Sequence, residues 1–308
     1  MRSWKQYLTM FLIFISIQAA ALLFAPVLLD LSFQAFDDPQ DPVNPLLYIL
    51  AMLLMTGAIL LMIKYAKERF LRLLFTVAIF FTLYAVFLPL AMLVSGDAVV
   101  ISVVPIGMAF VLTFFLYFRP EWYIIDLVGL IVATGATAIL GTSLGIMPAM
   151  LMLSILAIYD AISVYRTKHM LTLAEGVMEM RLPVLFIIPE SKKFKIEEME
   201  KMDLKDRSKD GERGTMMMGV GDGVIPGILV VSAGVFLSSA DGTFQYSVPA
   251  LLVALGTLVG ACIGFAVLMR LVATGRPQAG LPFLNGGAII GYILSYIIVF
   301  GDMSFGLG

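Results

Sequence analysis

Residues 98–118 have the sequence AVVISVVPIGMAFVLTFFLYF, a run of 21 residues without a charged side chain. A helix needs about 20 consecutive apolar residues to cross the hydrocarbon core of a bilayer, so this run predicts a transmembrane helix. Comparable runs follow at 7–31, 46–64, 70–94, 123–142, 147–167, 215–239, 247–271 and 281–301. The sequence therefore predicts an all-α polytopic membrane protein with about nine transmembrane helices.

The composition supports this fold class. Of the 308 residues, 60% are hydrophobic and 14% are charged, whereas soluble domains average roughly 45–50% apolar and about 25% charged residues. A net charge of -2 argues against a nucleic-acid partner. With one cysteine, Cys262, and one histidine, His169, neither an internal disulfide nor a cysteine- or histidine-rich zinc site is expected. We expect no metal and no cofactor.

The basic residues predict the orientation of the chain in the membrane. All 20 lysines and arginines lie before the first run, or in and around the second, fourth, sixth and eighth connections between runs. The odd-numbered connections and the C-terminal end carry only acidic charges, such as Asp97 and Asp302. Because cytoplasmic loops hold an excess of basic residues, the N-terminus is predicted inside and the C-terminus outside, in the cell membrane if the source is prokaryotic.

The sixth connection differs from the others in composition. Between Glu190 and Arg213, 16 of 24 residues are charged, and such a segment buries too little apolar surface to offset its chain entropy. We therefore predict a charged, mobile cytoplasmic loop at 181–214. It separates a six-helix N-terminal part, 1–180, from a three-helix C-terminal part, 215–308.

Acidic residues within apolar runs need an explanation, because a carboxylate in hydrocarbon is costly. Asp126 lies near the start of its run, close to Arg119, and is interpreted as an interfacial anchor. Asp160 and Asp222 lie deeper, roughly 9–14 Å from the nearest cytoplasmic charges at 1.5 Å per residue. They are at matched depth on successive antiparallel helices, so they can face each other.

Two such acids have an evident chemical use. Like charges held close together cannot both ionise, so one of the two acids retains a proton near neutral pH. The ionised member then activates a water molecule for attack on a peptide carbonyl, while the protonated member donates to the carbonyl oxygen. Alternatively, Asp160 and Asp222 face different parts of the bundle and each forms its own hydrogen bonds.

Other residues near these acids have two interpretations each. Gly219, Gly221 and Gly223 allow a close backbone approach beside Asp222, or serve ordinary helix packing. Tyr159 is positioned to form a hydrogen bond beside the acidic pair, or only packs in the bundle.

Pro282, at the start of the ninth run, also has two interpretations. It leaves irregular backbone that can hold an extended substrate strand, or it is a proline in the first turn of a helix.

The chain resembles the presenilin and signal peptide peptidase family of intramembrane aspartyl proteases, and looks like a prokaryotic or archaeal-type homologue. The resemblance rests on Tyr159-Asp160, on Gly219-x-Gly221-Asp222 and on a proline-leucine motif in the ninth run. That motif has the register Pro282-Phe283-Leu284, or alternatively Ala279-Gly280-Leu281 followed by Pro282.

The resemblance implies an aspartic endopeptidase that cuts transmembrane segments, such as signal-peptide remnants or single-span proteins. It implies Asp160 and Asp222 as the catalytic pair. The supporting or substrate-binding residues that it implies are Tyr159, Gly219, Gly221, Leu281, Pro282, Phe283 and Leu284. The expected partners are substrate transmembrane helices and the lipid bilayer, and homo-oligomerisation is left open.

Three other functions are compatible with some of these residues. A proton- or cation-coupled transporter or channel also uses buried acids, but it should show an internal repeat or paired broken helices, and the sequence shows neither. A prepilin-peptidase-like protease has a similar glycine-aspartate motif and acts near the cytoplasmic surface. A serine protease based on Gly141-x-Ser143-x-Gly145 is excluded, because Ser143 and His169 belong to opposite membrane faces, about 30 Å apart.

Overall fold

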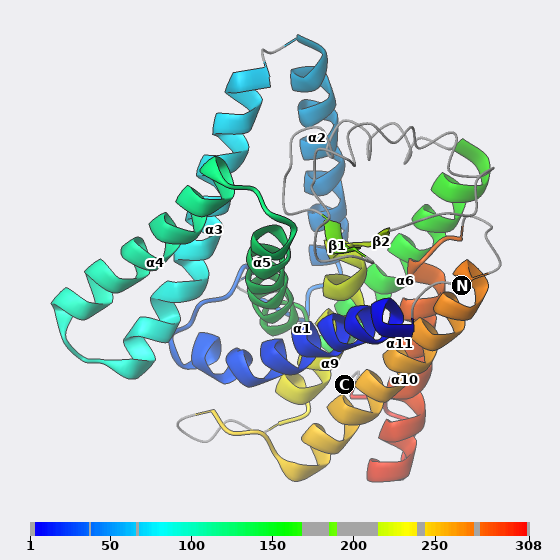
Figure 1. Cartoon of the computed structure of the whole chain (residues 1–308). Helices are drawn as coiled ribbons and strands as arrows, with labels where there is room; N and C mark the ends of the chain where they lie inside the picture. The colour runs from blue at the N-terminus through cyan, green and yellow to red at the C-terminus, as the bar shows by residue number, and fades with distance from the viewer. Residues whose placement is uncertain are drawn as a thin grey trace. The chain divides into compact units, whose positions relative to one another are not determined.

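The structure is a computed structural model that describes residues 4–36, 38–65, 68–167, 185–189, 215–238, 244–273 and 278–306. The α-helices of this part of the chain are α1 (Trp4–Asp30), α2 (Asn44–Tyr65), α3 (Glu68–Val94), α4 (Ala98–Phe118), α5 (Trp122–Ser143), α6 (Ile146–Ile162), α9 (Val220–Phe236), α10 (Val248–Val272) and α11 (Leu281–Phe300) (Figure 1). A π-helix, η1 (Ser163–Thr167), continues α6. Two strands, β1 (Leu185–Pro189) and β2 (Thr215–Gly219), form a small antiparallel sheet.

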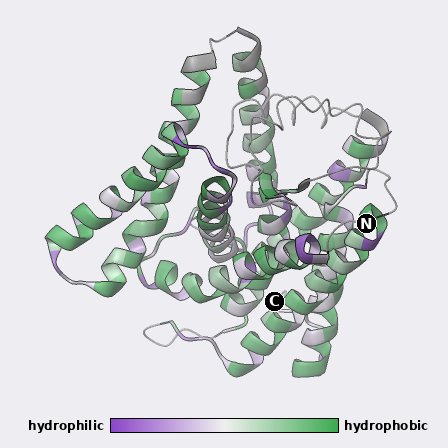
Figure 2. Ribbon diagram, in the orientation of Figure 1, coloured by the Kyte–Doolittle hydropathy of each residue, from purple (hydrophilic) through white to green (hydrophobic). Residues whose placement is uncertain are grey.

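Each predicted membrane span contains one of these helices. Within the described residues, 7 helices are long and apolar enough to cross a membrane, while the apolar parts of α2 and α9 are shorter. Figure 2 shows hydrophobic residues along most of the helices, with hydrophilic residues gathered mainly at their ends and in the connections. The prediction of an all-α polytopic fold is confirmed.

The exposed surface of α4 is also suited to lipid. Phe110, Phe114 and Phe118 recur every four residues and are 60%, 45% and 63% exposed. In water, such a row would form an apolar patch of the kind that drives association. Facing lipid tails, the same row has no such cost.

The predicted span at 215–239 is wrong at its start. Residues 215–219 form β2, which pairs with β1 from Leu185↔Gly219 to Pro189↔Thr215. Helix α9 begins only at Val220, so Asp222 lies in its first turn rather than deep within a helix. A continuous apolar run does not distinguish one long helix from a strand followed by a helix. Strand β1 falls within 181–214, and the rest of that predicted loop lies outside the described residues.

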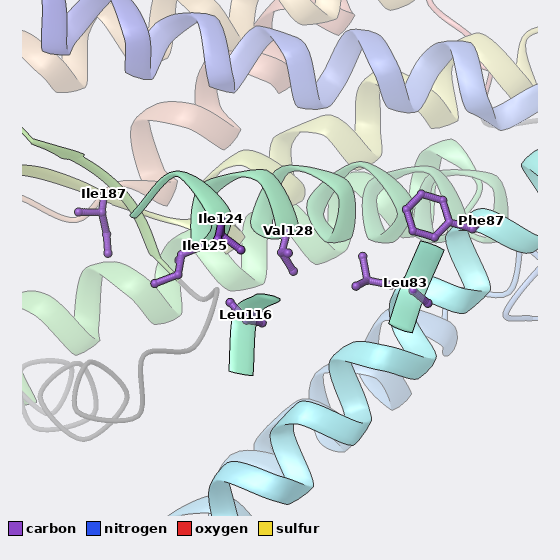
Figure 3. Close-up of a cluster of buried hydrophobic side chains, with 8 residues drawn as sticks. Leu83, Phe87, Leu116, Ile124, Ile125, Val128 and Ile187 are labelled. Atoms are coloured by element: carbon purple, nitrogen blue, oxygen red, sulfur yellow. The ribbon is translucent and has the colours of Figure 1, made fainter. Parts of the chain in front are cut away.

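The chain forms two compact units, and the first contains the described parts of residues 1–10, 51–133 and 169–220. A cluster of buried apolar side chains from α3, α4, α5 and β1 forms its core (Figure 3): Leu83, Phe87, Ala109, Leu116, Ile124, Ile125, Val128 and Ile187. The Asp126 carboxylate on α5 accepts a hydrogen bond of 2.8 Å from the Ile187 backbone N–H. This contact attaches β1 to α5 within the unit.

The second unit contains residues 11–50, 134–168 and 221–308, as far as they are described. In it, α11 packs against both α6 and α10. A Cβ added to Gly260 of α10 would collide with the Gly287 carbonyl oxygen and would lie 2.7 Å from the Gly291 Cα of α11. Glycines spaced four residues apart on both helices therefore let the two backbones touch, as in small-xxx-small helix pairs.

This contact predicts a different effect of alanine at two glycines. Gly260→Ala should lower the free energy of unfolding in detergent by about 1–3 kcal/mol, because the new methyl group overpacks a backbone contact. Gly286→Ala is the matched control, since a Cβ at Gly286 meets nothing within 4 Å. The control should be neutral or slightly stabilising, because alanine favours helix over glycine. Equal unfolding midpoints for the two variants would contradict this packing.

Candidate active site

Asp160 lies in the last turn of α6 and is only 3% exposed. The backbone N–H of Leu281 donates a hydrogen bond of 3.0 Å to its Oδ2 atom. The backbone of Gly280 forms a second hydrogen bond with the same carboxylate. The first amides of a helix have no partner within the helix, so the start of α11 supplies donors to a carboxylate that is shielded from water.

Asp222 lies in the first turn of α9, where an acidic side chain is favoured by the helix dipole. It is less buried than Asp160. A Cβ added to Gly280 would lie 3.6 Å from both carboxylate oxygens of Asp222. The Asp222 carboxylate is therefore directed at the backbone of Gly280.

The two predicted acids thus lie beside consecutive residues at the start of α11: Asp160 accepts a hydrogen bond from the Leu281 N–H, and Asp222 lies beside the position of a Cβ on Gly280. A Cβ and the next backbone nitrogen are about 3 Å apart, so these contacts place an Asp160 oxygen within about 10 Å of the Asp222 oxygens. All of these residues belong to the second unit. The pair could therefore act on one substrate bond.

The other residues predicted around the acids differ in position. Tyr159 is 48% exposed, although Asp160 beside it is buried. Gly219 ends β2 opposite Leu185. Gly221 is exposed, and a Cβ there would meet nothing within 4 Å, so no close approach requires glycine at this position. At Gly223, a Cβ would lie 2.7 Å from Ile17 Cδ1, the end of a side chain that would have to shift.

The ninth-run motif is helical from its first residue. Helix α11 begins at Leu281, and Pro282 occupies its first turn, so the interpretation of irregular backbone at 281–284 is not supported. Proline is tolerated there because the missing N–H is not needed for a helical hydrogen bond. Leu284 is fully buried, and the carbonyl of Phe283 lies against Gly264 of α10. The residues that lie at the carboxylates, Gly280 and Leu281, belong to the register Ala279-Gly280-Leu281.

Of the two serine-protease residues, only Ser143 lies in the described part of the chain. Ser143 Oγ accepts a hydrogen bond of 2.7 Å from the Ala35 backbone N–H, at the end of α5. His169 lies outside the described residues. In the part of the chain that the structure describes, no three His, Cys, Asp or Glu side chains gather in a way that could hold a metal ion.

Comparison with known proteins shows the family of the chain. The family model described as "Signal-peptide peptidase, presenilin aspartyl protease" matches residues 10–301. The chain belongs to this family. Its members in the solved structures include two described as a presenilin family intramembrane aspartate protease, in space groups C222 and P2.

Both solved structures resemble the chain over nearly its whole length. The C222 structure is 32% identical, covers 95% of this chain and 98% of its own, and has a TM-score of 0.66. The P2 structure is 33% identical, with coverage of 96% and 100% and a TM-score of 0.70. Among curated proteins, the comparison returned no match.

Membership of the presenilin and signal-peptide peptidase family defines the class of activity. The chain is an intramembrane aspartic endopeptidase and a multi-pass integral membrane protein. Its substrates are transmembrane segments in the lipid bilayer. The resemblance identified from the sequence motifs is confirmed, and the family match favours proteolysis over the transporter and channel alternatives.

Sequence reasoning missed two features of this region. The alternative register of the ninth-run motif includes Gly280 but gives it no role of its own, although it forms a hydrogen bond with Asp160 and a Cβ there would lie 3.6 Å from the Asp222 oxygens. The sheet was also missed, and the apolar run Leu185–Pro189 beside a charged segment was the signal that could have revealed it.

Proposed function

We propose that Asp160 and Asp222 are the catalytic pair, and that they hydrolyse a peptide bond of the substrate by activating one water molecule. The observation that carries this proposal is that both carboxylates lie beside consecutive residues at the start of α11: Leu281 donates its N–H to Asp160, and the Asp222 oxygens lie 3.6 Å from where a Cβ on Gly280 would be. The ionised carboxylate takes a proton from the water as the new C–O bond forms. The protonated carboxylate donates to the carbonyl oxygen, and a proton then passes to the leaving amine as the C–N bond breaks.

The start of α11 has two roles in this proposal. The Leu281 N–H holds the Oδ2 atom of Asp160, and the Gly280 backbone forms a second hydrogen bond with the same carboxylate. Gly280 has no side chain, so no Cβ lies against the Asp222 oxygens there. Pro282 fixes the first turn, while Phe283 and Leu284 attach the helix to its neighbours. Tyr159, Gly219 and Gly221 are proposed as flanking positions of the substrate site.

Replacing either acid should abolish cleavage without unfolding the protein. Asp160→Asn and Asp222→Asn preserve side-chain shape but remove the ionisable group, so each should lower the turnover of a single-span test substrate by at least about 10²-fold. The measurement is cleavage in detergent, with the unfolding midpoint of each variant as the control for fold. Folded variants that still cut would refute the pair.

We infer that the substrate is held as a third strand on β2. Ile187 donates its N–H to Asp126, so the outer edge of β1 is occupied. Ile187 is paired with Met217, and directly opposed residues of an antiparallel pair both point their backbone groups inward or both outward. The Met217 N–H therefore points to the outer edge of β2, where no other strand of the described residues pairs.

This edge is suited to an extended peptide. A sheet edge binds a strand through backbone hydrogen bonds with little dependence on sequence. The peptide bonds of a substrate helix are shielded, so the helix must be unwound before cleavage. Strand β2 ends at Gly219, three residues before Asp222 in the chain.

Proline at Met217 tests the edge. Met217→Pro removes the outward N–H but no hydrogen bond of the β1–β2 ladder, and proline is tolerated at such edge positions. Cleavage should fall at least about tenfold below that of the control Met217→Ala, which loses the same side chain but keeps the N–H. Both variants lose the packing of Met217 on the apolar cluster. Equal cleavage by the two variants would exclude strand addition on this edge.

For the orientation, we propose a cytoplasmic N-terminus and an external C-terminus. This proposal rests on the distribution of all 20 basic residues among the connections. In that orientation, Asp160 and Asp222 lie toward the cytoplasmic side of the membrane. The substrates that suit this site are signal-peptide remnants and single-span proteins.

Epitope tags test the orientation. External protease added to intact spheroplasts should remove a C-terminal tag and leave an N-terminal tag intact, because the membrane protects only the cytoplasmic end. Lysed spheroplasts are the control, in which both tags should be lost. Protection of the C-terminal tag in intact spheroplasts would contradict the proposed orientation.

A further inference from the structure

Asn285 is a fully buried polar residue on α11 that the catalytic proposal does not use. Its side chain is 0% exposed. Its Nδ2 atom donates a hydrogen bond of 2.9 Å to the Leu153 carbonyl oxygen on α6. Its Oδ1 atom has no hydrogen-bond partner among the described residues. A buried side-chain amide whose oxygen has no hydrogen-bond partner lowers the free energy of unfolding, so its presence needs an explanation.

Asn285 lies on the same faces of α6 and α11 as the contact that holds Asp160. It is four residues after Leu281, one helical turn, so both residues face α6. Its partner Leu153 is seven residues before Asp160, about two turns, so these two also share one face. The Asn285–Leu153 and Leu281–Asp160 hydrogen bonds therefore join the same pair of helix faces, one behind the other.

A third hydrogen bond completes this series. The Tyr165 hydroxyl, on η1, donates to the Gln278 side-chain oxygen at 3.0 Å. This bond is exposed, whereas the Asn285 bond is buried. The Asp160–Leu281 hydrogen bond thus lies between the buried Asn285–Leu153 hydrogen bond and the exposed Tyr165–Gln278 hydrogen bond. Of the two, the buried bond is better able to fix the helix against movement, since water does not compete for it.

The stability of the fold does not explain why an amide is needed. Leu153 lies within α6, where backbone carbonyls have helical partners, so its oxygen would not be left unsatisfied by loss of Asn285. Leucine has a similar size and no orphaned oxygen. An apolar side chain at 285 should therefore be at least as stable as asparagine, since replacing a poorly satisfied buried polar group is often neutral or stabilising.

We propose that Asn285 is a positioning residue that fixes the start of α11 in register with α6, so that the Leu281 N–H is held at the Asp160 carboxylate. Without the amide, α11 still packs on α6 but its first turn is free to shift by a fraction of a turn. The Asp160 carboxylate then loses its fixed donor and samples orientations that do not activate water. This inference rests on the proposed role of Asp160.

The test separates catalysis from stability with Asn285→Leu. We expect kcat for a single-span substrate in detergent to fall about tenfold or more, KM to change less than twofold, and the unfolding midpoint to stay equal or rise. Asn285→Ala is the second variant, with the same expected fall in kcat but a lower midpoint from the lost volume. A purely structural role predicts that activity and stability fall together.

Ser295→Ala is the matched control. Ser295 also lies on α11, and its part-buried hydroxyl reaches across the helix interface to the Val253 carbonyl oxygen of α10 at 3.2 Å. It is ten residues beyond Asn285 and fourteen beyond Leu281, far along the helix from the carboxylates. Its loss should leave kcat within about twofold of the parent. Unchanged kcat in Asn285→Leu, or equal losses in Asn285→Leu and Ser295→Ala, would overturn the positioning role. Cleavage by folded Asp160→Asn would instead overturn the proposed function itself.

Discussion

The first turn of α11 is the constraint on which the site depends. Its amides have no partner within the helix, and they meet a carboxylate that has left water for the interior of the bundle. The Asp160 carboxylate gives these amides a hydrogen-bond acceptor, and the amides give the carboxylate its donors. The adjacent glycine, Gly280, leaves room for the Asp222 carboxylate at the same place.

Two different kinds of packing hold this turn in position. On the α10 side, the contact is backbone against backbone through glycines such as Gly260 and Gly291, which fixes the distance between the helices closely. On the α6 side, the contact includes the hydrogen bonds of Asn285 and Leu281, which fix how far one helix slides along the other. Distance and register are thus determined by different neighbours, and α11 lies against both.

Most of the fold followed from the sequence because lipid imposes a simple rule on apolar runs. Each apolar run of about 20 residues includes a helix, because backbone groups in hydrocarbon must be paired within their own segment, and the polar segments between the runs separate these helices. The start of the seventh span did not follow. The run from Thr215 contains glycines and methionines that suit a strand or a helix, and its pairing with β1 depends on residues 26 or more positions earlier in the chain.

The site itself was predictable only in part, and for a similar reason. Asp160 and Asp222 stood out because charges are rare in apolar runs, and their motifs carried the family resemblance. Gly280 carried no such signal, since glycine is a common residue at the N-cap of a helix. Nor did the sequence indicate that Tyr159 faces outward while Asp160 faces inward. These properties arise from how α6 and α11 are rotated against each other, which is a tertiary feature.

The membrane also explains why hydrogen bonds at this interface serve register more than stability. Helices in lipid gain little from burying apolar side chains against each other, and a side-chain hydrogen bond between them contributes about 0.6 kcal/mol on average. Gln18 of α1 is fully buried, and neither of its amide atoms has a hydrogen-bond partner among the residues that the structure describes, so this bundle tolerates the cost of an orphaned polar group. A weak bond can still select one of several nearly equal helix registers, because neighbouring registers differ little in packing energy. For a carboxylate that must meet a substrate bond within a fraction of an ångström, that selection matters more than the bond's own strength.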